Sequence, residues 1–140
     1  HKYIMSDIGY RVTTNAIASA TYRAAEELDV AAIITPTSSG HTALSIAGYR
    51  PEAPIYGISR HEEILRRLSI CWGTKAVRVA KKENDDRREY TEDVFEYAIK
   101  AVTDAGLVKE GDRVITLVGL PRYIKKNTNT MRIHVIGEPM

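Results

Sequence analysis

The sequence has little of several features that mark particular classes of protein. Its 140 residues include one cysteine, Cys71, which excludes an internal disulfide and suits a reducing compartment. No apolar run approaches the roughly 20 residues of a membrane span, and no signal-peptide pattern opens the chain. The 20 basic and 18 acidic residues give a formal net charge of only +2. This balance argues against nucleic acid and membrane partners, so any anion site has to be local.

Motifs for metal binding and catalysis are also missing. No histidine pair stands with cysteine or carboxylate at the spacing of metal ligands, and no nucleophile can be paired with a base. Cys71 adjoins Trp72 in an apolar setting, which favours packing over reactivity. His61 has no partner in view, and His134 alternates with apolar neighbours, which predicts a place on the less buried side of an edge strand. The sequence therefore predicts neither a metal site nor a catalytic centre.

What the chain does have is a regular alternation of strand and helix patterns. Short apolar runs predict buried strands at 30–34, 55–58, 76–80, 114–118 and 131–136. Helical spacing of apolar residues predicts helices at 13–28, 43–49, 59–68 and 90–105. Cap signals support these helices: Thr13, Thr14 and Asn15 before the first, a capping box of Ser59 and Glu62, and Gly106 after the last.

This order of elements predicts an α/β domain with a mainly parallel sheet and helices on both faces. Only about a dozen polar residues, and no helix, separate the last two strands, which favours antiparallel pairing. The expected fold is a three-layer α/β/α domain over residues 1–140, with a five-stranded, mostly parallel sheet whose last strand is antiparallel. Because the chain begins with His1 and not Met, we expect a piece of a longer protein or tag remnants.

The most informative stretch is residues 35–42, which joins a buried strand to a helix start. It holds five hydroxyl side chains, and Gly40 lets the backbone approach a ligand. The N–H groups of a helix start attract anions, and no lysine follows Gly40, so this is not a nucleoside-triphosphate loop. Phosphate binding and simple helix capping by serine and threonine both remain open from this pattern. The candidate residues are Thr37, Ser38, Ser39, Gly40, His41 and Thr42.

A second polar loop lies between the last two strands, at residues 119–129. It supplies cations and amides, among them Arg122, Lys125, Lys126 and Asn127. Ligands of open α/β sheets sit beyond the carboxyl ends of strands, where the winding direction reverses. If the first strand adjoins the fourth, the two loops face each other across that crevice. For each lysine alone, a solvated basic loop is the alternative interpretation.

Several segments of the chain, taken together, resemble the carboxy-terminal domain of pyruvate kinases. They occur in the family's order and spacing across nearly the whole chain. The segments are 31–34, 37–43, 49–51, 53–55, 72–73, 111–115 and 127–132. The family's domain has a five-stranded sheet between helices, with the last strand antiparallel, which agrees with the fold expected from the pattern.

The resemblance implies a place in an enzyme that transfers a phosphoryl group from phosphoenolpyruvate to ADP, in the cytoplasm. That chemistry uses magnesium and usually potassium in a separate barrel domain, whose motifs are missing here, so no cofactor and no catalysis are expected of this domain alone. The family's domain holds an allosteric effector site and a main subunit contact of a tetramer. We therefore expect a phosphorylated effector and self-association through helices. The segment matching Thr37–Thr42 holds the effector's phosphate, and the loop matching Arg122–Asn129 closes over it.

Departures from the family pattern leave the effector open. Members activated by fructose bisphosphate commonly have a basic residue where His41 stands, a glycine-rich closing loop, and a tryptophan/arginine pair before the long helix. Here the closing loop contains Tyr123–Lys126, and the segment before the helix has Arg87 and Arg88 without tryptophan. Two rival interpretations are a stand-alone phosphometabolite binder or enzyme on the same domain, and a pure interaction module with an empty crevice.

Overall fold

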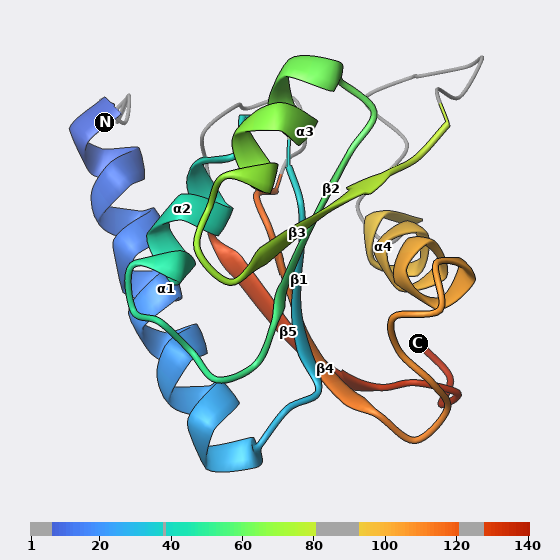
Figure 1. The fold of residues 1–140 in the computed structure, drawn as a ribbon. Helices are drawn as coiled ribbons and strands as arrows, with labels where there is room; N and C mark the ends of the chain where they lie inside the picture. Colours follow the sequence, from blue (N-terminus) through green and yellow to red (C-terminus); the bar gives the residue numbers. More distant parts are fainter. Residues whose placement is uncertain (1–6, 38, 81–92, 121–127) are drawn as a thin grey trace.

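The computed structural model describes residues 7–37, 39–80, 93–120 and 128–140, which form a sheet with helices on both sides (Figure 1). The sheet has five strands in the order β3-β2-β1-β4-β5. Its strands are β1 (Ala32–Pro36), β2 (Ile55–Ser59), β3 (Thr74–Arg78), β4 (Arg113–Val118) and β5 (Thr130–Val135). The first four run parallel, and β5 pairs antiparallel with β4. The fold class and the antiparallel last strand are thus confirmed.

The helices divide between the two faces of the sheet. The helices α1 (Asp7–Leu28), α2 (His41–Ala47) and α3 (Glu62–Ser69) cover one face, and α4 (Asp93–Asp104) covers the other (Figure 1). Neighbouring residues of β1 alternate between them, so that Ile33 packs in the core under α1 to α3 and Ile34 in the core under α4. This double burial explains why the central strands are continuous apolar runs.

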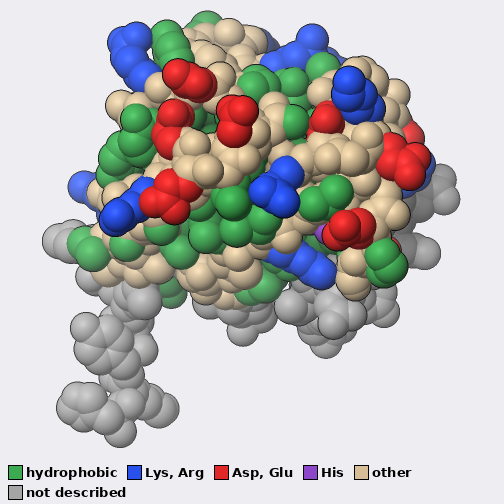
Figure 2. Space-filling model, turned by 90° about the horizontal axis from the view of Figure 1, so that it is seen from below, with side chains coloured by type: hydrophobic (Ala, Val, Ile, Leu, Met, Phe, Trp, Pro, Cys, Tyr) green, Lys and Arg blue, Asp and Glu red, His purple; other side chains and the backbone are tan. Residues whose placement is uncertain are grey.

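Charged side chains of both signs are mixed at one end of the molecule (Figure 2). Figure 2 shows the molecule from the end at which β1 begins, where basic, acidic and apolar side chains are interspersed. This agrees with the nearly balanced composition of the chain. The fold therefore offers no broad cationic face at this end.

The first helix begins earlier than its sequence pattern predicts. It starts at Asp7, six residues before Thr13, so the predicted caps Thr13 and Thr14 are wrong because both lie inside the helix. The Thr13 hydroxyl donates to the Gly9 carbonyl across 3.0 Å, and Thr14 is only 5% exposed. Threonine is tolerated inside a helix when its hydroxyl bonds the preceding turn or a neighbouring segment.

The predicted capping box before α3 is also wrong. Ser59 is the last residue of β2, and the N-cap of α3 is His61, in an extended conformation without a side-chain cap. The Ser59 hydroxyl accepts the His61 N–H at 3.1 Å, so it shapes the turn before the helix and not the helix start. The predicted inward residues of α3, Ile64, Leu65 and Leu68, are confirmed as buried.

The predicted glycine cap after α4 is confirmed. Gly106 has φ +72°, its N–H donates to the Thr103 carbonyl at 3.0 Å, and the Leu107 N–H donates to the Val102 carbonyl at 3.0 Å. This pair of bonds is the Schellman arrangement, which glycine favours because it adopts positive φ without strain.

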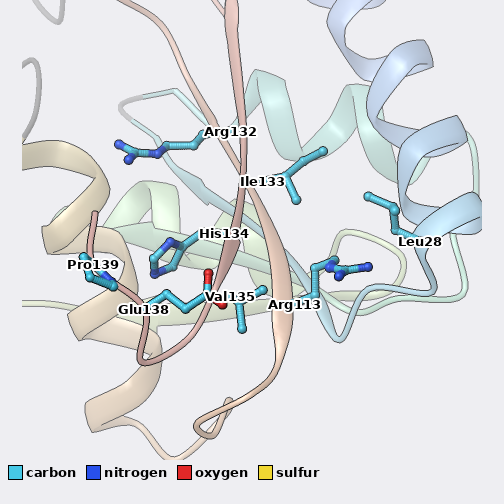
Figure 3. Close-up of a pocket in the computed structure, with 8 residues that line it drawn as sticks. All are labelled: Leu28, Arg113, Arg132, Ile133, His134, Val135, Glu138 and Pro139. Carbon is cyan, nitrogen blue, oxygen red and sulfur yellow. The ribbon is translucent and has the colours of Figure 1, made fainter.

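In the outer strand β5, the buried and the exposed side chains are the reverse of what we predicted for His134 and its neighbours. His134 is 8% exposed, whereas Ile133 is 46% exposed. His134 lies opposite Val114, a residue of the core under α4, while Ile133 lies opposite Ile115 on the other face. In Figure 3 the two side chains leave β5 on opposite sides of a shallow pocket, and the carboxy-terminal residues Glu138 and Pro139 lie on the histidine side. These terminal residues and α4 cover His134, so the prediction was wrong.

Candidate phosphate-binding site

The described ends of the two polar loops singled out in the sequence lie at the same end of the sheet. β1 and β4 are adjacent and parallel, with Ile33 opposite Ile115, so their carboxyl ends lie side by side. The hydroxyl of Thr42, the last residue of the first stretch, hydrogen-bonds the hydroxyl of Thr128, near the end of the second, although 86 residues separate them in sequence. The condition stated for the two loops to face each other, that the first strand adjoins the fourth, is met.

Thr37 organises the first loop. Its hydroxyl oxygen accepts the N–H groups of Ser39 at 3.2 Å and of Gly40 at 2.7 Å. Its own N–H donates to the Ile58 carbonyl of β2 at 3.0 Å, which fixes the residue to the sheet. A hydroxyl that accepts from backbone amides still has its own proton to donate. The Thr37 hydroxyl is therefore held in place with a donor available for an anion.

The Ser39 hydroxyl, like that of Thr37, accepts a hydrogen bond from a backbone N–H further along the loop. Its oxygen accepts the His41 N–H at 3.4 Å, and the side chain is partly exposed. The backbone N–H groups of Ser39, Gly40 and His41 are thus already engaged by side-chain oxygens. What this loop offers a ligand is hydroxyl protons more than backbone amides. The helix α2 that follows has only seven residues, so we assign no anion binding to its dipole.

Gly40 is required by the backbone at the start of α2. It is the N-cap residue with φ +82°, a left-handed conformation that costs roughly 1–2 kcal/mol for residues with a side chain. Among the described residues, no atom lies within 4 Å of a Cβ added at Gly40. The space beside its Cα is therefore free of the other described side chains.

Thr14 and Thr128 lie beside this site and hold its two segments together, and sequence analysis missed both. The Thr128 N–H donates to the Thr14 hydroxyl oxygen at 3.4 Å, and the two residues are 3% and 5% exposed. Thr128 stood in a run of polar residues without an apolar pattern, and Thr14 was taken for a helix cap. Their pairing joins residues 114 positions apart, which local spacing cannot show.

The comparisons with known proteins show which family the chain resembles. A sequence profile described as the pyruvate kinase alpha/beta domain matches residues 15–134. The chain belongs to the pyruvate kinase family. A pyruvate kinase of Geobacillus stearothermophilus is 40% identical over 125 residues, which is 89% of this chain and 20% of that protein. One of Clostridium acetobutylicum is 30% identical over 124 residues, 89% of this chain and 25% of that protein. This pyruvate kinase domain thus spans about a fifth to a quarter of the relatives it matches.

The predicted site residues of this pyruvate kinase domain fall into two groups. Thr37, Ser39, Gly40, His41 and Thr42 lie together at the end of β1 and the start of α2, with His41 exposed and Thr42 only 9% exposed. The remaining candidates lie outside the described residues: Ser38, Arg122, Lys125, Lys126 and Asn127.

The base of the second loop is closed by Asn129. Its side-chain oxygen accepts the Leu120 N–H at 3.0 Å, and its side-chain nitrogen donates to the Leu120 carbonyl at 2.7 Å. Its own N–H donates to the Val118 carbonyl at 3.2 Å. The Asn129 amide thus extends the pairing of β4 with β5 by one step. It therefore serves the chain and not a ligand.

Other candidate chemistry is limited in the described part of the domain. Burial raises the pKa of the Cys71 thiol, which favours the protonated, less nucleophilic form. No group of three or more histidine, cysteine or acidic side chains among the described residues is arranged to hold a metal ion. In the same residues, no helix combines the length and apolar character that crossing a bilayer requires.

Proposed function

We propose that the chain is the regulatory and assembly domain of a pyruvate kinase, and that it binds a phosphorylated effector at Thr37–Thr42. The observation that carries this proposal is the pair of hydroxyls, Thr37 and Ser39, whose oxygens are held by backbone N–H groups at the end of β1. Transfer of a phosphoryl group from phosphoenolpyruvate to ADP would take place in another part of a longer, cytoplasmic polypeptide. The small share of each relative that this chain covers supports that division.

The chemistry of the loop suits a phosphate group. A phosphate presents oxygens that accept hydrogen bonds, and hydroxyl protons from Thr37, Ser39 and Thr42 can reach several of them at once. The exposed His41 stands at the start of α2, where its ring can donate to the same group. We propose that Arg122, Lys125, Lys126 and Asn127 add charge and donors from the second loop.

Self-association through the helices is the second half of the proposal. α1 and α2 pack against each other, and each exposes a large apolar side chain, Val12 at 62% and Leu44 at 56%. Exposed apolar groups on neighbouring helices are typical of contact surfaces. Analytical ultracentrifugation tests this half: wild type should sediment as an oligomer, and Leu44→Glu should shift it toward monomer. A monomeric wild type at high concentration contradicts it.

Ligand binding is tested by calorimetric and thermal-shift titrations with sugar phosphates, nucleoside monophosphates, triose phosphates and inorganic phosphate. A ligand at 100 times its Kd should add about 2.7 kcal/mol to the free energy of unfolding. Ser39→Ala should weaken binding by roughly 0.5–1.5 kcal/mol, through loss of one hydrogen bond. Gly40→Val should weaken it further, because it strains the backbone and fills the open space beside it.

A matched control is Ser69→Ala, which removes an exposed hydroxyl that donates to the Arg66 carbonyl at the end of α3. That variant should bind phosphate compounds as wild type does. If no phosphate compound stabilises the wild type, the binding half of the proposal is wrong. If Ser39→Ala and Gly40→Val both bind normally, the site lies elsewhere.

A further inference from the structure

Three buried threonines from distant parts of the chain meet beside the candidate site. Thr42 lies in the first turn of α2, Thr128 just before β5, and Thr14 in α1, with exposed fractions of 9%, 3% and 5%. We propose that Thr128 is a positioning residue for the ligand. We further propose that ligand binding at the site affects helix α1 through the two hydrogen bonds that join Thr42 to Thr128 and Thr128 to Thr14. This inference rests on the proposed binding function and names how that site is coupled to the rest of the domain.

The geometry forms a continuous chain of polar contacts. The Thr42 and Thr128 hydroxyls bond each other, and the Thr128 N–H donates to the Thr14 hydroxyl oxygen at 3.4 Å. Two hydroxyls that share one hydrogen bond use only one of their two protons. The second proton of the Thr42–Thr128 pair belongs to whichever residue accepts in that bond. The pair therefore has two possible donor–acceptor orders: either Thr42 donates to Thr128, or Thr128 donates to Thr42.

A bound phosphate selects one of these orders. Its oxygens accept hydrogen bonds. When the Thr42 hydroxyl donates its hydrogen bond to the phosphate, its oxygen can only accept the hydrogen bond that the Thr128 hydroxyl donates. The bonds then run in a single direction, from Thr128 to Thr42 to the ligand, and the charged end strengthens the bond behind it. Removing the Thr128 hydroxyl should thus weaken binding although Thr128 does not touch the ligand.

Thr128 is well placed to transmit this ordering because its backbone is held on both sides. Its N–H is bonded to Thr14 of α1, and the adjacent Asn129 is tied to Leu120 by two hydrogen bonds. A shift of Thr128 toward Thr42 therefore acts on α1. Buried hydroxyls need partners, and apolar residues of the same shape would serve stability as well. A role in coupling the site to α1 would explain why three buried threonines, and not apolar residues, occupy these positions.

The first measurement is calorimetric titration of inorganic phosphate into the 140-residue chain and its variants. Thr128→Val should raise the Kd by about 2- to 10-fold, the loss of one hydrogen bond, while Thr128→Ser should restore it. In the double variant Thr42→Val with Thr128→Val, the second change should add nothing to the first. An unchanged Kd for Thr128→Val, or effects that simply add, overturns the inference.

The second measurement is amide hydrogen exchange in α1 with and without inorganic phosphate. Phosphate should slow exchange around residues 11–18 of wild type more than exchange in α4, which serves as the internal reference. Thr14→Val should still bind phosphate within about 2-fold of wild type, because the direct contacts remain, but should lose the extra slowing in α1. Equal slowing of α1 and α4 in wild type contradicts transmission through Thr14.

The controls separate this inference from the proposed function. Thr103→Val removes an exposed hydroxyl on α4 that donates to the Ile99 carbonyl, and it should leave the Kd unchanged. A wild type that binds phosphate and is indifferent to Thr128→Val refutes only the coupling. A wild type that binds no phosphate compound refutes both proposals. Should Thr128→Val fail to fold by circular dichroism, Thr14→Val and Thr128→Ser decide the matter through the exchange measurement.

Discussion

The two ends of the sheet carry different kinds of side chain on the same apolar support. At the carboxyl end of β1 the chain presents hydroxyls, with Thr37 and Ser39 holding the backbone around them. At the end where β2 and β3 begin, three large apolar or aromatic side chains are exposed among charged ones (Figure 2): Tyr49 at 41%, Ile70 at 86% and Trp72 at 47%. The strands β1 and β2, which run between these two ends, are buried along their whole length. Loops, and not the sheet, decide what each end can bind.

The aromatic end is organised by contacts between rings and a cation. The Arg50 guanidinium lies 5.2 Å from the centre of the Trp72 ring, and Tyr22 and Tyr49 stack with their ring centres 5.5 Å apart. Tryptophan, tyrosine and arginine are the residues that protein contacts use most. The difference teaches that one sheet presents hydroxyl groups at one end and exposed aromatic and apolar groups at the other, which are the two kinds of surface that our proposals of ligand binding and protein contact require.

The largest expected effect comes from Thr37→Val, which removes the hydroxyl that holds the loop at the carboxyl end of β1. It leaves the N–H groups of Ser39 and Gly40 without their acceptor, at a cost of about 1–3 kcal/mol in the free energy of unfolding, lessened by water. Phosphate binding should be lost with it. Urea unfolding and calorimetry measure the two effects. Thr37→Ser, which keeps the hydroxyl, should behave nearly as wild type, and a Thr37→Val protein as stable as wild type would contradict the assigned role.

Thr35→Val sharpens the comparison, because it separates a buried hydroxyl from those that serve the site. Thr35 is fully buried in β1, and its hydroxyl has no hydrogen-bond partner among the residues that the structure describes. Replacing that hydroxyl by a methyl group should raise the free energy of unfolding by about 1 kcal/mol and leave phosphate affinity unchanged. Thr21→Val is the matched control: its hydroxyl donates to the Met131 sulfur at 3.3 Å, so no gain is expected. Weaker phosphate binding by Thr35→Val would show that this hydroxyl belongs to the site.

Much of the fold could be predicted because double burial leaves a clear mark on a sequence. A strand covered on both faces, such as β1, needs an unbroken apolar run, and the short polar stretch without a helix pattern between the last two predicted strands favours an antiparallel return. The start of α1 could not be predicted because Thr13 and Thr14 are equally good at caps and inside a helix with a partner. The orientation of β5 could not be predicted either. Alternation defines two faces, but which of them α4 and the terminal residues cover is a matter of tertiary packing.

The candidate site was only half visible in the sequence for the same reason. Thr37–Thr42 stand together in the chain, so their hydroxyls and glycine form a local pattern. The contacts of Thr128 with Thr42 and Thr14 join residues 86 and 114 positions apart, and nothing in local spacing indicates them. Residue identity shows which groups can bind an anion, whereas the topology decides which of them meet.

The smallest expected effect is at the aromatic end, where Arg50→Met removes the charge over Trp72 but keeps much of the side chain's length. The loss of this contact should lower the free energy of unfolding by about 0.5–1 kcal/mol, the usual size at an exposed site. The Kd for inorganic phosphate should not change, because the two ends share only the buried strands. Lys109→Met, an exposed cation before β4, controls for the change in net charge. If Arg50→Met alters phosphate affinity and Lys109→Met does not, the two ends are coupled through the sheet and the division between them fails.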